Sequence, residues 1–135
     1  MLIGRKTFDE MQGWFTDQTP IVLTRQKSYS AHSSALVTNS VADAIKIAEK
    51  LQTSELVVAG GAAVYTAALP YATKLVLTWI ETENRLDVDY PVFFPSFNKG
   101  TWVSKKIEQW PADDENSHLM TLEILEAQEN SRVLM

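Results

Sequence analysis

Cysteine is missing from the sequence, which excludes disulfide bonds, thiol nucleophiles and zinc–thiolate sites. Two histidines, His32 and His118, are too few for a metal centre built from imidazole. Twelve Lys and Arg against seventeen Asp and Glu give a net charge of −5, which disfavours binding to nucleic acid or an anionic membrane. No apolar run approaches the roughly 20 residues that a membrane-spanning helix needs. These absences leave a soluble, cytoplasmic globular domain as the expectation.

The 135 residues have room for one hydrophobic core, and 45% of them are hydrophobic, so we expect a single domain over residues 1–135. Short apolar runs alternate with stretches of helical spacing. Strands are predicted at residues 1–3, 20–24, 35–38, 55–59 and 74–80. Helices are predicted at residues 5–12, 41–51 and 62–69, the second with Ser40 as its N-cap and the third ended by Pro70.

Two further strands are predicted at residues 102–107 and 118–125. The polar stretch between them, residues 112–117, is too short for a crossover helix, so these strands should pair antiparallel. The whole pattern predicts an α/β fold, in which a mostly parallel central sheet is flanked by helices and followed by an antiparallel C-terminal hairpin.

The first candidate ligand site follows the first predicted strand, because ligands of such sheets bind at the carboxyl ends of strands. The segment Gly4, Arg5, Lys6 and Thr7 opens a helix and offers backbone N–H groups, two cations and a hydroxyl to a phosphate. The alternative is an ordinary helix start with solvated charges.

Two more predicted strands end in segments of the same kind. After residues 55–59 the chain has almost no side-chain bulk, so a ligand can approach the backbone of Gly60, Gly61, Ala62, Ala63, Val64 and Tyr65. After residues 20–24, the sequence Leu23, Thr24 and Arg25 could hold a phosphomonoester through the hydroxyl and the guanidinium. A tight turn and a polar loop start are the plainer alternatives. Three such strand ends together indicate a nucleotide with more than one phosphate.

These motifs, in this order, resemble the dihydrofolate reductase family. The resemblance covers nearly the whole chain, at residues 4–8, 20–25, 59–65, 75–78, the Asp and Phe-Pro segment up to Pro95, 116–118 and 122–125. It implies a reductase that transfers hydride from NADPH to the pterin ring of dihydrofolate.

The resemblance also implies roles for the candidate residues. Arg5, Lys6 and Thr7 would hold the cofactor phosphates, and Thr24 with Arg25 would bind the 2′-phosphate that distinguishes NADPH from NADH. The segment from Gly60 and Gly61 to Tyr65 would lie along the pyrophosphate and nicotinamide, with a cis bond between the glycines. Thr78, a hydroxyl within an apolar strand, would orient the pterin.

Two features depart from the family pattern. A strand, a mobile loop and an acid-bearing helix precede the Gly-Arg-Lys-Thr match in the family, so we expect an N-terminally incomplete domain and assign no catalytic residue. The sequence also has Gln18 where the family places an arginine that binds the glutamate carboxylate of folate. Losing that cation should weaken binding of the folate tail.

Two other functions remain as alternatives. One is the related pyrimidine reductase of riboflavin synthesis, although its acidic strand and glycine-rich turn are not evident between residues 72 and 95. The other is a non-catalytic domain that binds NADPH without turnover. We also expect self-association, because an unpaired apolar strand at a sheet edge promotes it.

Overall fold

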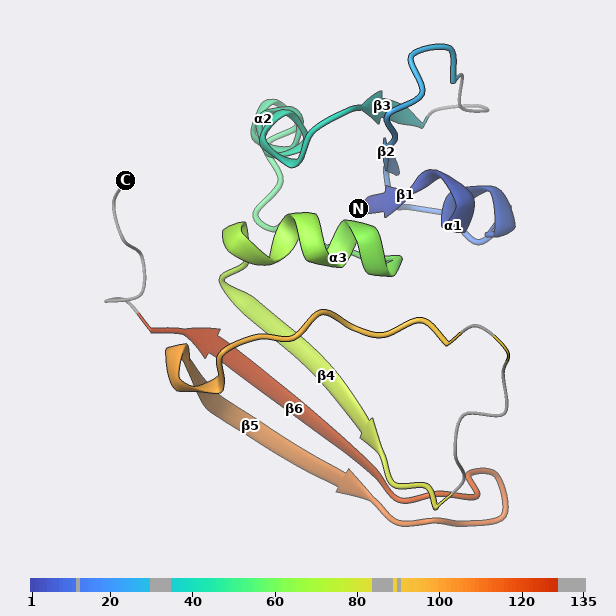
Figure 1. Ribbon diagram of the computed structural model, residues 1–135, viewed down its shortest axis with the longest axis vertical. Helices are drawn as coiled ribbons and strands as arrows, with labels where there is room; N and C mark the ends of the chain where they lie inside the picture. Colours follow the sequence, from blue (N-terminus) through green and yellow to red (C-terminus); the bar gives the residue numbers. More distant parts are fainter. Residues whose placement is uncertain (12, 30–34, 84–88, 90, 129–135) are drawn as a thin grey trace. The chain divides into compact units, whose positions relative to one another are not determined.

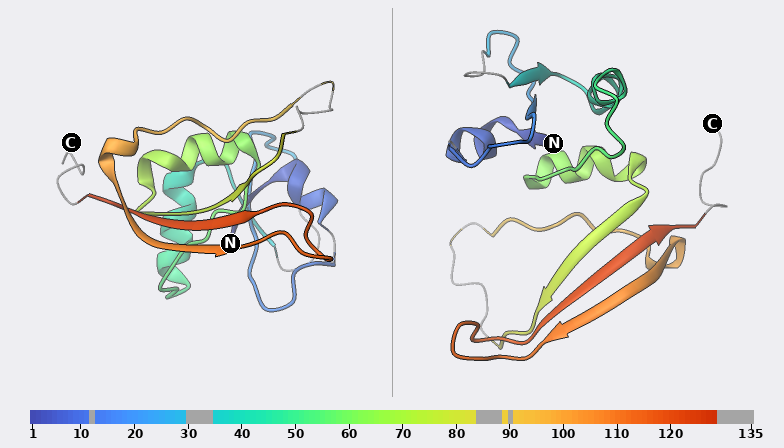
Figure 2. Two further views of the ribbon diagram at one scale, coloured as in Figure 1. Left: turned by 90° about the horizontal axis from the view of Figure 1, so that it is seen from below. Right: turned by 180° about the vertical axis from the view of Figure 1, so that it is seen from behind.

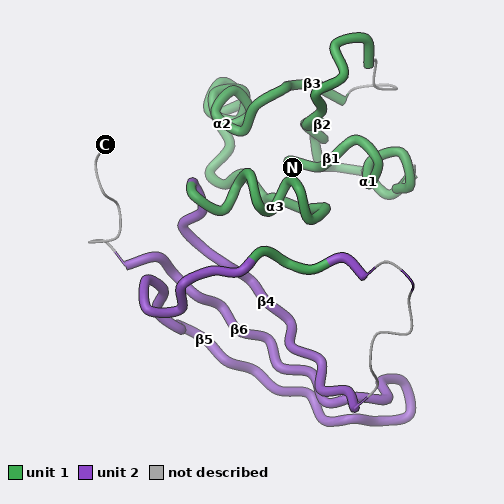
Figure 3. The backbone as a smooth tube through the Cα atoms, viewed as in Figure 1, with its two compact units in different colours: residues 1–70, 93–95 green, residues 71–92, 96–135 purple. Residues whose placement is uncertain are grey.

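The computed structural model describes residues 1–11, 13–29, 35–83, 89 and 91–128. They divide into two compact units (Figure 3). Unit 1 comprises residues 1–70 and 93–95, and unit 2 comprises residues 71–92 and 96–135. His32 and Asp87 lie outside the described residues.

Unit 1 contains a parallel sheet in the order β1-β2-β3 (Figure 1). Its strands are β1 (Leu2–Gly4), β2 (Ile21–Leu23) and β3 (Leu36–Thr38), at the three places where short apolar runs predict them. The segment predicted as a strand at residues 55–59 lies beside β1 and forms a parallel bridge between Leu2 and Val58. Backbone hydrogen bonds join it to β1: the N–H of Leu2 donates to the carbonyl of Val57, and the N–H of Ala59 donates to the carbonyl of Leu2.

Helices lie against this sheet: α1 (Arg5–Glu10), α2 (Val41–Lys50) and α3 (Ala62–Ala68), which the short helix η1 (Leu69–Tyr71) follows. Successive strand residues point to opposite faces, so the sheet supports two clusters of buried side chains. One cluster joins the sheet to α2 and α3 and contains Leu2, Ile21, Val41, Ala44, Val64 and Ala68. The other packs against α1 and contains Ile3, Phe8 and Val22. This packing fixes the strand ends that carry the candidate site.

Unit 2 contains an antiparallel sheet in the order β4-β6-β5. The strands are β4 (Lys74–Ile80), β5 (Trp102–Trp110) and β6 (Met120–Ala127), with the short helix η2 (Lys99–Thr101) before β5. Figure 2 shows the three strands side by side in two further views. On one face of this sheet the cross-strand partners Leu75 and Leu125 are both buried.

The predicted α/β class is confirmed, as is the antiparallel pairing of the two C-terminal strands. The antiparallel part is larger than a hairpin, because β4 pairs with β6 along its whole length. Alternation of apolar residues predicts that residues 74–80 form a strand, but it does not determine the direction of the neighbouring strand.

Candidate functional site

The carboxyl ends of the strands in unit 1 lie at one edge of the parallel sheet, as the sequence analysis predicted. Gly4 is in register with Leu23, and Leu23 is in register with Thr38. The segments that follow β1 and β2, which begin at Arg5 and Thr24, therefore leave the sheet at neighbouring positions (Figure 1).

The two glycine-bearing segments meet at this edge. The backbone N–H of Gly4 donates to the carbonyl oxygen of Gly60 over 2.8 Å. A Cβ atom on Gly4 would lie 3.1 Å from Cγ2 of Val64, so a larger residue there would press on the side chain of Val64. The segments at residues 4–7 and 60–65, far apart in sequence, are thus joined at Gly4 and Gly60.

Gly60 and Gly61 are joined by a cis peptide bond, as the family resemblance implied. Gly60 has φ +106°, a backbone conformation that residues with side chains rarely adopt. A Cβ atom there would meet the Tyr65 ring, at 3.1 Å from Cε2 and 3.2 Å from the hydroxyl oxygen. At Gly61, a Cβ atom would lie 3.3 Å from Oγ1 of Thr7. The side chains of Thr7 and Tyr65 therefore flank the glycine pair.

Helix α3 begins immediately after the glycines. Gly61 is its N-cap, without a side-chain cap, and its carbonyl oxygen accepts from the N–H of Tyr65 over 3.0 Å. Ala62 is half-buried and Ala63 is exposed, whereas Val64 is buried in the core. Because the first turn carries the small side chains of Ala62 and Ala63, its backbone remains accessible to a ligand.

The ring of Tyr65 also packs against Phe94, with 5.0 Å between the ring centroids and 52° between the ring planes. Phe94 is 40% exposed and belongs to unit 1, although residues on both sides of 93–95 belong to unit 2. No role for Phe94 was evident from the sequence alone. The signal in the sequence was the run of three apolar residues at 92–94, because consecutive apolar residues in a loop indicate a contact with another segment or a ligand.

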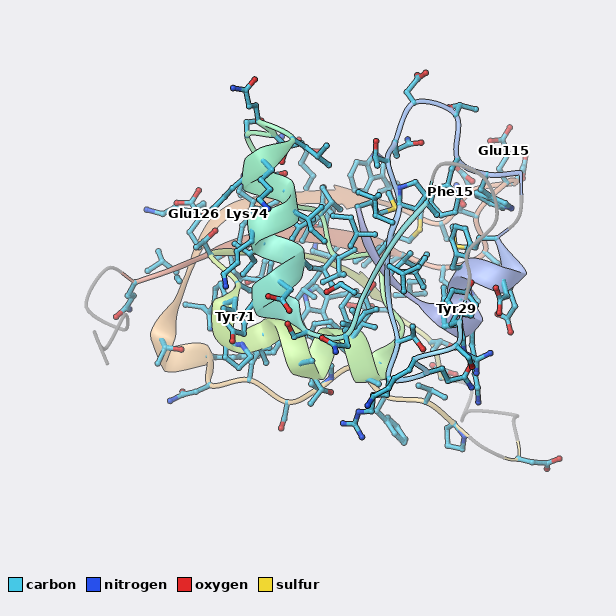
Figure 4. All side chains as sticks on the ribbon, turned by 90° about the horizontal axis from the view of Figure 1, so that it is seen from above. Phe15, Tyr29, Tyr71, Lys74, Glu115 and Glu126 are labelled. Carbon is cyan, nitrogen blue, oxygen red and sulfur yellow. The ribbon has the colours of Figure 1, made fainter. Side chains whose placement is uncertain are left out.

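Arg5 lies beside a carboxylate of its own helix, with 3.7 Å between Nη1 and Oδ2 of Asp9. Asp9 also accepts a hydrogen bond of 2.9 Å from the hydroxyl of Tyr29, which lies beside α1 (Figure 4). Burial and the hydrogen bond to Asp9 raise the pKa of Tyr29, against a smaller opposing effect of Arg5. Lys6 is exposed. The Asp9–Tyr29 contact was missed, because twenty residues separate its members.

The segment after β2 is ordered by its own hydrogen bonds. The backbone N–H of Thr24 donates to the carbonyl of Thr38 over 3.0 Å, and its hydroxyl oxygen accepts from the N–H of Gln26 over 3.1 Å. Leu23 and Thr24 are half-buried, whereas Arg25 is exposed. This arrangement holds the backbone of the turn while the guanidinium stays accessible.

Thr78 belongs to unit 2, on β4 and in register with Leu122 of β6. It lines a pocket of about 450 Å³ together with Trp110, Asp113, Asn116, Met120 and Leu122. The carboxylate of Asp113 accepts from the N–H groups of Glu115 and Asn116, over 2.9 and 2.7 Å. The acidic run at residues 113–115 is therefore a structured turn with exposed side chains.

Gln18, which stands in place of the family's arginine, is exposed and accepts a hydrogen bond of 3.3 Å from the backbone N–H of Thr16. It lines a pocket of unit 1 with a volume of about 290 Å³, whose apolar wall includes Ile21, Ala48 and Leu56. Its side-chain amide is uncharged, so it does not bring the positive charge that the arginine would supply.

Within the described parts of the chain, no three His, Asp or Glu side chains are grouped so that they could hold a metal ion. The nitrogen Nδ1 of His118 lies 2.8 Å from the hydroxyl of Ser117. In the same described residues, no helix has the length and apolar character needed to cross a membrane.

The chain is similar to known proteins over most of its length. A family model described as dihydrofolate reductase matches residues 1–127. The dihydrofolate reductase of Haemophilus influenzae is 31% identical over 118 residues, which span 87% of this chain and 69% of that protein. The enzyme of Buchnera aphidicola subsp. Baizongia pistaciae is 32% identical over 128 residues, spanning 93% and 73%.

A similar solved structure is that of the Enterococcus faecalis dihydrofolate reductase complexed with NADP(H) and RAB-propyl. Its TM-score to this chain is 0.75 at 26% sequence identity, and the match covers 95% of this chain and 73% of that one.

Proposed function

Because the chain belongs to the dihydrofolate reductase family, we propose that it transfers hydride from NADPH to dihydrofolate in folate metabolism. The observation that carries this proposal is the backbone contact between Gly4 and Gly60, which joins the two glycine-bearing segments at one edge of the parallel sheet. Ligands of α/β sheets bind at that edge. The NADP(H) bound by the similar Enterococcus faecalis enzyme supports the same cofactor here.

The residues at this edge fit the phosphates of a dinucleotide. Gly61 has no side chain to separate its backbone from the hydroxyl of Thr7, which a Cβ atom would approach to 3.3 Å. A phosphate oxygen placed there is within reach of backbone N–H groups and this hydroxyl, and Lys6 adds positive charge from an exposed position. Arg5 contributes charge from the same helix, where it lies 3.7 Å from the carboxylate of Asp9.

The segment Leu23, Thr24 and Arg25 would select NADPH over NADH. The extra 2′-phosphate of NADPH carries charge that NADH lacks, and an exposed guanidinium binds phosphate through two parallel hydrogen bonds. The backbone of Thr24 is held by Thr38, so Arg25 leaves an ordered turn rather than a loose loop. Positioning of this kind lowers the entropy lost on binding.

The other end of the cofactor would lie along Gly60, Gly61, Ala62, Ala63, Val64 and Tyr65. NADPH, when bound, supplies the hydride. The chain's own contribution is to hold the nicotinamide end against the glycine backbone, beside the Tyr65 ring. Thr78 would orient the pterin through its hydroxyl, from a strand otherwise rich in apolar residues.

A comparison of cofactor affinities tests the proposal. A hydrogen bond to a charged group contributes about 1.5–3 kcal/mol, so Arg25→Ala should weaken NADPH binding roughly tenfold or more and leave NADH unchanged. The matched control is Lys27→Ala, which removes an exposed cation two residues away. Equal affinity of the unmodified chain for the two cofactors, or equal effects of the two substitutions, would contradict the assignment.

We also propose that the chain works in the cytoplasm and self-associates through β4. This strand is at an edge of its sheet, and Val76 and Ile80 are 60% and 57% exposed. Edge strands with exposed apolar side chains tend to pair with a second chain. Light scattering on the purified protein tests this point, and a monomer at all concentrations would refute it.

A further inference from the structure

The aromatic ring of Tyr65 has two neighbours within unit 1. One is Gly60, where an added Cβ atom would come within 3.1 to 3.2 Å of Cε2, Cζ and the hydroxyl oxygen of Tyr65. The second is Phe94, whose ring centroid lies 5.0 Å from that of Tyr65. The tyrosine ring thus occupies the space that a side chain at Gly60 would take.

Phe94 restricts where this ring can go. Aromatic rings at 5.0 Å and 52° are in the range of favourable tilted packing, which resists rotation of either ring. Tyr65 is on α3, whereas Phe94 comes from a segment 29 residues later in the sequence. Contact from so distant a segment fixes the tyrosine in a way that the helix alone does not, because a side chain on a helix surface has several rotamers available.

We propose that Phe94 is a positioning residue for the cofactor site and acts through Tyr65. The inference rests on the proposed function, since it takes the glycine pair as the place where the nicotinamide end of NADPH lies. Phe94 holds the Tyr65 ring and hydroxyl against the backbone of Gly60, so that the cofactor meets a preformed surface. Without Phe94 the ring leaves this position in a fraction of the molecules, and binding must first restore it.

The size of the effect follows from the ring pair. Such pairs contribute about 0.5–1.5 kcal/mol, which corresponds to a loss of affinity of roughly two- to tenfold when the pair is broken. Phe94→Ala should therefore weaken NADPH binding within that range. Phe94→Tyr, which keeps an aromatic ring, should restore most of it.

The matched control is Phe93→Ala. Phe93 is adjacent in sequence and is 67% exposed, compared with 40% for Phe94. If loss of an aromatic side chain from this segment weakened binding in general, both substitutions would act alike. The proposal predicts that Phe93→Ala leaves the dissociation constant for NADPH within about twofold of the unmodified value.

A double-mutant cycle with Tyr65→Ala tests whether Phe94 acts through the tyrosine. Tyr65→Ala removes the ring that packs on Phe94, so Phe94 has no tyrosine ring left to position in that variant. NADPH affinity is measured by titration calorimetry for the unmodified chain, both single variants and the double variant. Thermal unfolding of each variant shows that it is folded at the temperature of the titration.

The proposal predicts that Phe94→Ala weakens NADPH binding roughly two- to tenfold when Tyr65 is present and has little further effect in the Tyr65→Ala variant. Independent effects, in which the two losses multiply, would overturn the inference while leaving the proposed function intact. An unmodified chain that does not bind NADPH would overturn both.

Discussion

Gly60→Ala perturbs the candidate site in a way whose effect can be worked out from the structure. Gly60 is buried, and its φ of +106° is unfavourable for any residue with a Cβ atom. Forcing an L-residue into a left-handed conformation costs about 1–2 kcal/mol. This first contribution depends only on the backbone and not on what surrounds it.

A second contribution comes from the Tyr65 ring, whose nearest carbon would lie 3.1 Å from the new Cβ atom. The ring has to move, and the contact with Phe94 opposes this movement. Overpacking of this kind costs about 1–3 kcal/mol. Together the two contributions predict that Gly60→Ala lowers the free energy of unfolding by about 2–5 kcal/mol.

Gly13 provides the matched control, because it also has positive φ, +85°, but no atom lies within 4 Å of its would-be Cβ. Gly13→Ala should therefore show the backbone contribution alone, about 1–2 kcal/mol. Urea unfolding followed by circular dichroism gives both values, provided that the slope with denaturant is unchanged. If the two substitutions cost the same, the packing of Tyr65 on Gly60 contributes nothing and this reasoning is wrong.

Two further predictions concern the substrate tail and the pH dependence of stability. Gln18→Arg should tighten binding of dihydrofolate roughly tenfold through a charge-assisted contact with the tail carboxylate, and leave a pterin without a tail unchanged. Equal gains for both ligands in a binding titration would contradict the role given to Gln18. The raised pKa of Tyr29 gives a stabilisation that is fully present below pH about 10 and is lost as pH rises through the folded pKa. Tyr29→Phe should therefore lower stability near pH 8 but flatten the decline above pH about 10. Parallel curves of stability against pH would show that the contact with Asp9 has no such effect.

The parts of the fold that depend on local signals were predictable from the sequence. Ser40 is the N-cap of α2, and its hydroxyl oxygen accepts from the N–H of Asp43 over 3.1 Å, as a Ser with an acidic residue three positions later indicates. The antiparallel pairing of β5 with β6 followed from the short polar connection between them. In both cases the determining residues are close together in the chain.

Features that depend on distant residues were harder to predict. The segment at residues 55–59 pairs in parallel with β1 at Val58, and the apolar run there contains no information on its partner. Sequence reasoning placed both glycine segments at one sheet edge. It did not predict that the Tyr65 ring would lie on Gly60 or that Phe94 would pack on that ring, because these contacts depend on tertiary packing.

The central claim is that this chain is a reductase that uses NADPH, and dihydrofolate-dependent oxidation of NADPH tests it most directly. The loss of NADPH absorbance is followed with purified protein, with dihydrofolate present or omitted and with NADH in place of NADPH. The account predicts oxidation that requires dihydrofolate and is faster with NADPH than with NADH. Binding of NADPH without any oxidation on addition of dihydrofolate would contradict it.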